Sequence, residues 1–112
     1  MNLEKDLDFR QRNFKVEVSE QCAEEIVEIY NYISNVLKQK EIARRMFLEL
    51  SYKIINIKEN PSIYMKIGKA DKLNREYHRM VIKNYIVLYT IDYEKEKVYI
   101  SHMFYGRKNY LY

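Results

Sequence analysis

Residues 76–92 read Glu-Tyr-His-Arg-Met-Val-Ile-Lys-Asn-Tyr-Ile-Val-Leu-Tyr-Thr-Ile-Asp. β-Branched and aromatic residues dominate two runs, Tyr77–Ile82 and Tyr85–Asp92, which only Lys83 and Asn84 separate. Two strand-like runs joined by two residues predict a β-hairpin, with Asn84 able to adopt the positive φ of a tight turn. The stretch therefore predicts two adjacent antiparallel strands.

A third strand is predicted directly after the hairpin. A polar turn at 93–96 leads into the run Lys97–Tyr105, which Gly106 interrupts. Three consecutive antiparallel strands form a meander. The two-residue period of a strand divides the first of them into two faces, one with Tyr77, Arg79 and Val81 and the other with His78, Met80 and Ile82.

Two amphipathic helices are predicted upstream of the meander. The alternating run Phe14–Ser19 predicts a strand, and Ser19 can cap the helix that follows. The apolar stripe of the first helix is Cys22, Ala23, Ile26, Ile29, Tyr30, Ile33, Val36 and Leu37, and that of the second is Ala43, Met46, Phe47, Leu50, Ile54 and Ile57. A polar break at 38–40 separates the helices, and Pro61 ends the second, because the residue before a proline is excluded from the helical region. We expect an antiparallel helical hairpin that needs a sheet to cover its stripes.

The order of these elements predicts the fold class. It is β-α-α-β-β-β, an α+β fold in which the helical hairpin packs on a mainly antiparallel, twisted sheet. We expect one domain over residues 14–112, preceded by a polar arm at 1–13. Residues 61–73 form the connection, with a bend at Gly68, and the first strand is expected at one edge of the sheet or inside it.

Charge is distributed unevenly along the chain. The 112 residues carry a formal charge of +4. Residues 1–65 have 10 basic and 11 acidic side chains (net −1), whereas residues 66–112 have 10 and 5 (net +5). A basic C-terminal half indicates an anionic partner, either nucleic acid or an acidic protein, or else simply a solvated surface. Twelve tyrosines, seven of them between Tyr85 and Tyr112, suit half-buried strands and equally the stacking of bases.

Several classes of protein are excluded or disfavoured by the sequence. No apolar run approaches the roughly 20 residues that span a membrane, and the polar first residues argue against a signal peptide. One cysteine and two histidines cannot supply a zinc site, and two glycines cannot supply a phosphate loop. Cys22 lies on an apolar stripe and is interpreted as a buried structural residue. We therefore expect a cytoplasmic protein without cofactor or metal, whose phosphate chemistry, if any, is metal-free.

The segments of the chain resemble the RelE/ParE toxin family, in order and over residues 14–110. The family's C-terminal half has an Arg-bearing strand, a tight turn, an "N-Y-x-x-x-Y" strand and a "[HY]-G-[RK]-[RK]-[DN]" tail, to which Arg79, residues 84–89 and residues 105–109 correspond. Residues 14–19, 24–33 and 43–47 resemble its opening strand and its two helices. The resemblance implies a toxin that a cognate antitoxin neutralises, with formation of a toxin–antitoxin oligomer. RelE-like members cut mRNA on the ribosome, whereas ParE-like members poison DNA gyrase, and both targets stay open here.

The resemblance also implies the candidate site. Metal-free RNA cleavage needs a base, an acid and fixed cations near the phosphate. Matching positions give a catalytic set of Arg79, His102, Arg107 and Tyr110 and a nucleic-acid-binding set of Lys83, Tyr105 and Lys108. The alternatives are an ion pair of Arg79 with Glu76 or with an acidic residue of a helix, a core histidine at 102 and a solvated tail.

Ile86 departs from the family pattern. Several mRNA-cutting members have an arginine at this position, and an isoleucine cannot hold a phosphate. This favours a ParE-like or catalytically altered member. The second hypothesis is a decayed module that binds only antitoxin or nucleic acid.

Overall fold

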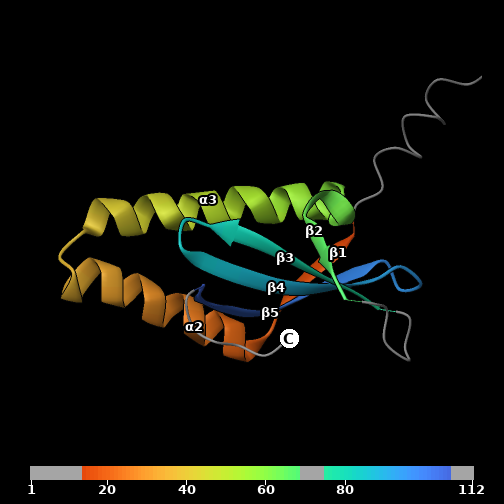
Figure 1. Cartoon of the computed structure of the whole chain (residues 1–112), viewed down its shortest axis with the longest axis horizontal. Coiled ribbons are helices and arrows are strands. Elements are labelled where there is room, and N and C mark those ends of the chain that lie inside the picture. Colours follow the sequence, from red (N-terminus) through yellow and green to blue (C-terminus); the bar gives the residue numbers. More distant parts are fainter. Residues whose placement is uncertain (1–13, 69–74, 107–112) are drawn as a thin grey trace, which may run out of the picture.

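Two helices cover one face of a five-stranded sheet in the computed structural model, which describes residues 14–68 and 75–106 (Figure 1). The predicted arm at 1–13 lies outside the described residues. The elements are β1 (Lys15–Val18), α2 (Glu20–Asn31), the π-helical turn η1 (Tyr32–Val36), α3 (Lys40–Glu59), the 3-10 turn η2 (Pro61–Ile63), β2 (Met65–Ile67), β3 (Glu76–Ile82), β4 (Tyr85–Asp92) and β5 (Lys97–Tyr105). The predicted α+β class is confirmed. Neither helix in the described part of the chain is long and apolar enough to cross a membrane.

The strand order is β1-β5-β4-β3-β2. The meander of β3, β4 and β5 is antiparallel, as predicted, and β1 pairs in parallel with β5 at one edge. The connection contains one strand more than the predicted order, because β2 pairs with β3 at the opposite edge. Gly68 follows β2 with a φ of 65°, which confirms the predicted bend.

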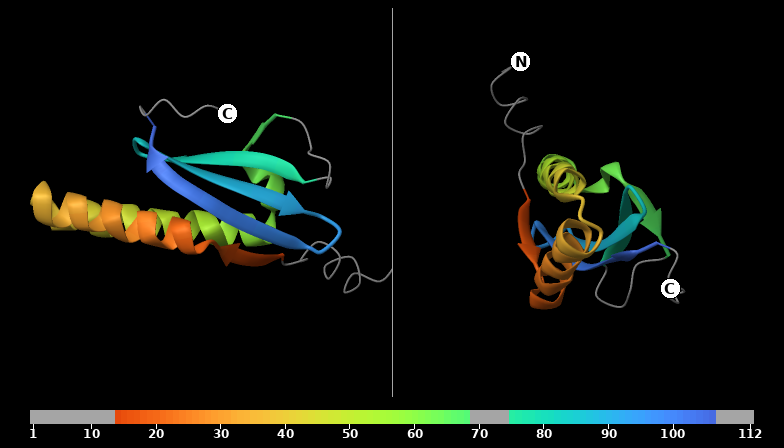
Figure 2. Two further views of the ribbon diagram at one scale, coloured as in Figure 1. Left: turned by 90° about the horizontal axis from the view of Figure 1, so that it is seen from below. Right: turned by 90° about the vertical axis from the view of Figure 1, so that its left-hand side faces the viewer.

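The helical hairpin begins and reverses at identifiable residues. The hydroxyl of Ser19 accepts a hydrogen bond from the backbone N–H of Cys22 at 3.0 Å, which confirms Ser19 as the cap of α2. After η1, Lys38 adopts a φ of 58°, and the chain turns back into α3. Seen from below in Figure 2, α2 and α3 run side by side along one face of the strands. The turn at residues 38–39 therefore makes the two helices antiparallel.

The core lies between this hairpin and the inner face of the sheet. The buried cluster consists of Phe14, Cys22, Ile33, Ala43, Met46, Leu50, Ile57, Met80, Ile82, Val87, Tyr89, Ile91, Val98, Ile100 and Met103. Four members of the predicted stripes, Ala23, Val36, Leu37 and Phe47, are exposed instead. Val36 and Leu37 fall where η1 gives way to the reversal of the chain, and Phe47 packs edge-on against Tyr30 of α2 rather than under the sheet.

The turn between β3 and β4 differs from the prediction in one residue. The positive φ belongs to Lys83, at 54°, and not to Asn84. The carbonyl of Asn84 instead accepts a hydrogen bond from the N–H of Gly106 at 2.6 Å. This contact fastens the end of β5 to the hairpin turn.

Candidate functional site

Arg79 and His102 lie in one row on the outer face of the sheet. Leu88 of β4 pairs with Arg79 of β3 on one side and with His102 of β5 on the other. Directly paired residues of antiparallel strands share a face, and strands lie about 4.8 Å apart, so roughly 10 Å separates the Cα atoms of Arg79 and His102. The helices cover the opposite face (Figure 2). The row therefore presents two candidate catalytic side chains on the side of the sheet that α2 and α3 leave open.

A β-bulge in β5 puts His102 on this face. The register with β4 shifts between Leu88 and Tyr89, which pair with His102 and Ile100, and this leaves Ser101 as the extra residue. Without the bulge, His102 would share the inner face with Ile100. Instead Met103 points into the core, and the side chain of His102 is 39% exposed. The alternative of a core histidine is wrong.

Glu25 of α2 is the carboxylate next to His102. Its Oε1 lies 3.5 Å from Nδ1 of His102 and accepts a hydrogen bond from the backbone N–H of Met103 at 3.0 Å. Beyond the end of β1, this carboxylate satisfies the exposed edge of β5. A carboxylate next to an imidazole orients the ring. The sequence predicted no role for Glu25 beside the histidine, because no local pattern shows which turn of α2 faces the bulge.

Arg79 does not form the ion pair with Glu76 that the sequence left open. The carboxylate of Glu76 lies 2.9 Å from Nε2 of His78 and 4.0 Å from Nζ of Lys66. Within residues 14–68 and 75–106, no carboxylate forms an ion pair with Arg79. Its face was predicted correctly, because Tyr77, Arg79 and Val81 are half-buried or exposed, whereas His78, Met80 and Ile82 are buried.

The next row of the outer face is apolar. Ile86 pairs with Val81 and with Phe104, and Ile86 is only 7% exposed. Ile86, the position that departs from the family pattern, thus lies one row from Arg79 and His102 and adds no cation to their row.

Lys83 and Tyr105 line a groove between the helical hairpin and the end of the sheet. The groove has a volume of about 940 Å³, and its other lining residues include Glu25, Glu28, Tyr32, Ile42, Tyr85 and Met103. The rings of Tyr85 and Tyr105 meet edge to face with centroids 5.7 Å apart. Burial raises the pKa of Tyr85, and the neighbouring Tyr32 and Tyr105 add to the rise. Lys83 and Tyr105, which line this groove, thus lie away from the Arg79–His102 row.

The remaining candidates cannot be placed. Arg107, Lys108 and Tyr110 lie outside the described residues. Among the residues that are described, no group of three His, Cys, Asp or Glu side chains could hold a metal ion. Cys22 is fully buried, and burial raises its pKa to about 11, so its thiol stays neutral and unreactive.

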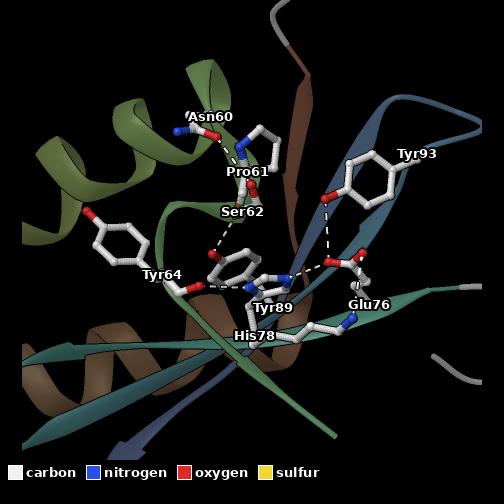
Figure 3. Close-up of polar contacts among 9 residues, drawn as sticks. Asn60, Pro61, Ser62, Tyr64, Glu76, His78, Tyr89 and Tyr93 are labelled. Carbon is white, nitrogen blue, oxygen red and sulfur yellow. Dashed lines mark hydrogen bonds and ion pairs between the residues drawn. The ribbon is translucent and has the colours of Figure 1, made fainter. Parts of the chain in front are cut away.

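His78 is the second histidine, and it belongs to a buried hydrogen-bond network on the inner face of the sheet (Figure 3). Its Nδ1 lies 2.9 Å from the carbonyl oxygen of Tyr64 and its Nε2 lies 2.9 Å from Glu76 Oε1. Its ring stacks on Tyr89, whose hydroxyl donates to the carbonyl of Pro61 at 2.7 Å. These contacts tie the segment from Pro61 to Tyr64 to β3 and β4, so the role of His78 is structural.

Known proteins share this architecture. The archaeal RelE–RelB complex from Pyrococcus horikoshii OT3 aligns with a TM-score of 0.54 and 16% identity over 87% of this chain and 99% of that chain. A chromosomal ParDE system from P. aeruginosa aligns with a TM-score of 0.62 and 9% identity over 84% and 97%. The isolated E. coli RelE toxin aligns with a TM-score of 0.51 and 12% identity over 86% and 87%. At these identities the likeness shows the fold alone.

The sequence itself decides the family. No curated protein matches the chain in sequence. The model of the ParE toxin of the type II toxin–antitoxin system parDE, however, matches residues 16–110, which include both helices, β2 to β5 and all of β1 except Lys15. The chain therefore belongs to the ParE toxin family, within the RelE/ParE superfamily of type II toxin–antitoxin toxins.

Proposed function

We propose that the chain inhibits growth by acting on nucleic-acid machinery through its outer sheet face, with DNA gyrase as the target. The observation that carries the proposal is the row in which Arg79 and His102 flank Leu88 on the face opposite α2 and α3. A guanidinium binds phosphate oxygens in a bidentate manner, and an imidazole N–H can donate a hydrogen bond to a phosphate oxygen. At roughly 10 Å between their Cα atoms, both side chains can reach one phosphate or two neighbouring ones.

Two observations favour gyrase over mRNA. The matching family model is that of ParE, and it spans most of the chain. The buried Ile86 leaves the neighbouring row without the cation that mRNA-cutting relatives have there. The Arg79–His102 pair by itself also suits metal-independent RNA cleavage, so the experiment must separate the two targets. Either target lies in the cytoplasm, which is where we expect the protein to act.

The groove supports the second half of the proposal, neutralisation by an antitoxin. Its lining combines apolar side chains with three tyrosines, Tyr32, Tyr85 and Tyr105, and with the carboxylates of Glu25 and Glu28. An amphipathic antitoxin segment that carries a lysine or arginine fits this chemistry. Glu25 also lies beside His102. A cation of the antitoxin that binds Glu25 from the groove would therefore change the contact between Glu25 and His102.

Induced expression of the chain in a bacterial host tests the toxin assignment. We expect arrested growth with gyrase trapped on cleaved DNA, and co-expression of the neighbouring small acidic reading frame should restore growth. Arg79→Ala should relieve the arrest, whereas Lys95→Ala, a cation in the exposed turn after β4, should not.

Three results would contradict parts of this proposal. Unaffected growth on induction leaves a module that only binds antitoxin or nucleic acid. Codon-phased mRNA cuts without trapped gyrase identify the RelE-like target instead. Full toxicity of the Arg79→Ala variant removes Arg79 from the site.

A further inference from the structure

Glu25 belongs both to the groove and to the surroundings of the Arg79–His102 row. Its side chain lines the groove, and its Oε1 lies 3.5 Å from Nδ1 of His102, which lies on the outer face. Lys83 and Tyr105 line the same groove but lie away from the row. A segment that fills the groove therefore binds beside the helical hairpin and not on the row, and Glu25 is the point at which the two sites meet.

The fold holds Glu25 at the edge of β5. α2 begins at the bulge, where the backbone N–H of Ser19 donates to the carbonyl of Ile100 and its hydroxyl donates to the carbonyl of Ser101, each at 2.9 Å. Further along the helix, Oε1 of Glu25 accepts the hydrogen bond from the backbone N–H of Met103 at 3.0 Å. The carboxylate is therefore fixed at the edge between the two faces of the sheet by a backbone contact of its own.

The contact of Glu25 with His102 is the longer of the two contacts that its Oε1 makes. Its 3.5 Å exceeds the separation of about 2.7–2.9 Å that is typical of a hydrogen bond between two charged groups. The other carboxylate oxygen, Oε2, forms no hydrogen bond within residues 14–68 and 75–106, and the side chain is 20% exposed. A guanidinium or ammonium group that enters the groove can therefore bind the carboxylate in place of the imidazole.

The charge of the groove favours such a cation. Glu28 follows Glu25 by three positions on α2 and lines the same groove, and α2 contains no lysine or arginine. Lys83 also lines the groove, but in the described part of the chain it forms no ion pair with either glutamate. Two acidic side chains and one basic side chain give the lining a net charge of −1. A cation between the two carboxylates would remove the repulsion of like charges that are neighbours on a helix.

We propose that Glu25 is a positioning residue that links the groove to the Arg79–His102 row. Without a partner, Glu25 holds the ring of His102 in the row. A cationic side chain of the antitoxin that binds in the groove takes the carboxylate and releases the ring. The antitoxin thus neutralises the chain without covering Arg79 or His102. This link rests on the proposed function, which assigns the groove to the antitoxin and the row to the target.

Nuclear magnetic resonance of the histidine side chains tests the link in the full chain, made by cell-free synthesis and kept at constant pH. The chain has two histidines, and the resonances that His102→Gln removes are those of His102. We expect Glu25→Gln to let the χ1 angle of His102 average over several rotamers, which its three-bond Hα–Hβ couplings report. Glu24→Gln, at an exposed position of the same helix, should leave these couplings unchanged. Glutamine keeps an acceptor for the N–H of Met103, so thermal melting should show that both variants fold.

N-acetyl-argininamide serves as the probe for the cation in the groove, and the uncharged N-acetyl-citrullinamide is its matched control. We expect the arginine probe to change the couplings of His102 in the wild type as Glu25→Gln does, and the citrulline probe to leave them unchanged. Glu25→Gln should weaken binding of the arginine probe about tenfold, as expected for the loss of a hydrogen bond between two charged groups. Glu24→Gln should bind the probe as tightly as the wild type.

Growth arrest separates failure of the link from failure of the proposed function. In a toxic chain, Glu25→Gln should relieve the arrest and Glu24→Gln should not. A His102 ring that keeps one rotamer in Glu25→Gln, or in the wild type with the arginine probe, overturns the link and leaves the toxin assignment standing. An equal response to the two probes also overturns the link, because the charge then has no role. A ring that responds as expected in a chain without toxicity overturns the toxin assignment instead.

Discussion

Nε2 of His78 lies 2.9 Å from Oε1 of Glu76, and the side chain of His78 is only 1% exposed. The other ring nitrogen lies 2.9 Å from the carbonyl oxygen of Tyr64. Both ring nitrogens of His78 thus lie within hydrogen-bonding distance of an oxygen atom. The ring therefore bridges the backbone of Tyr64 and the carboxylate of Glu76 and holds the chain before β2 against β3.

The acid dependence of stability should reflect Glu76. The hydrogen bond from His78 lowers the pKa of Glu76 below its ordinary value of 4.5, with further lowering by the charges of Lys66 and His78. A lowered native pKa means that this stabilisation is present above about pH 4.5 and is lost as the pH falls through the native pKa. Urea unfolding between pH 3 and 7 should show a shallower loss of stability for Glu76→Gln than for the wild type. Parallel curves would contradict this, and Glu94→Gln in the exposed turn is the control.

Replacing His78 should cost more than its burial alone suggests. His78→Phe keeps an aromatic ring against Tyr89 but leaves the Tyr64 carbonyl without its donor and removes one donor from Glu76, which keeps the hydroxyl of Tyr93 at 3.4 Å. We expect a loss of about 2–4 kcal/mol in the free energy of unfolding, because the variant loses a hydrogen bond to a carboxylate and leaves the carbonyl unsatisfied. Tyr89→Phe removes only the hydrogen bond to Pro61 and should cost about 1 kcal/mol. Equal losses for the two variants in chemical denaturation would show that the network does not depend on the histidine.

Lys38→Gly should stabilise the protein. Lys38 holds a φ of 58° at the reversal between η1 and α3, where the N–H of Gln39 donates to the carbonyl of Ile33 at 3.0 Å. This left-handed conformation strains any residue with a Cβ, so glycine should raise the free energy of unfolding by about 0.5–1 kcal/mol. Glu28→Gly, inside α2, should lower it by about 0.8 kcal/mol. A thermal melt that moves both variants in the same direction would be inconsistent with this assignment.

Local patterns predicted the two helices, the first strand and the meander, whereas tertiary contacts decided β2, the bulge in β5 and the neighbours of His102. Met65–Ile67 is too short to show a period and is a strand only because β3 pairs with it. The bulge at Ser101 has no glycine or proline to mark it, although it decides the face on which His102 lies. The face of Arg79 was predictable because β3 alternates regularly and has no bulge. The proximity of Glu25 to His102 was not predictable, because it depends on how α2 lies against β5.

Gly106→Ala should destabilise the end of β5. A Cβ at this position would lie 3.0 Å from the carbonyl oxygen of Asn84 and 3.4 Å from two carbons of Ile86. The Ile86 side chain can adjust, but the Asn84 backbone is held by the turn, so we expect a loss of about 1–2 kcal/mol. Ile86→Val should not rescue the variant in a thermal melt. A full rescue would mean that the side chain, and not the backbone, requires the glycine.

Arg79 and His102 should act as a unit if they bind the same phosphate. We expect Arg79→Ala and His102→Ala each to relieve growth arrest strongly and the double variant to add little, because either loss leaves the phosphate without its second partner. Growth rates at matched expression levels, with thermal melts to confirm folding, give the coupling between the two positions. Combining Arg79→Ala with Lys83→Ala, on the groove side of the sheet, provides the control cycle, whose effects should be additive. Additive effects of Arg79→Ala and His102→Ala would show instead that the two residues serve separate contacts.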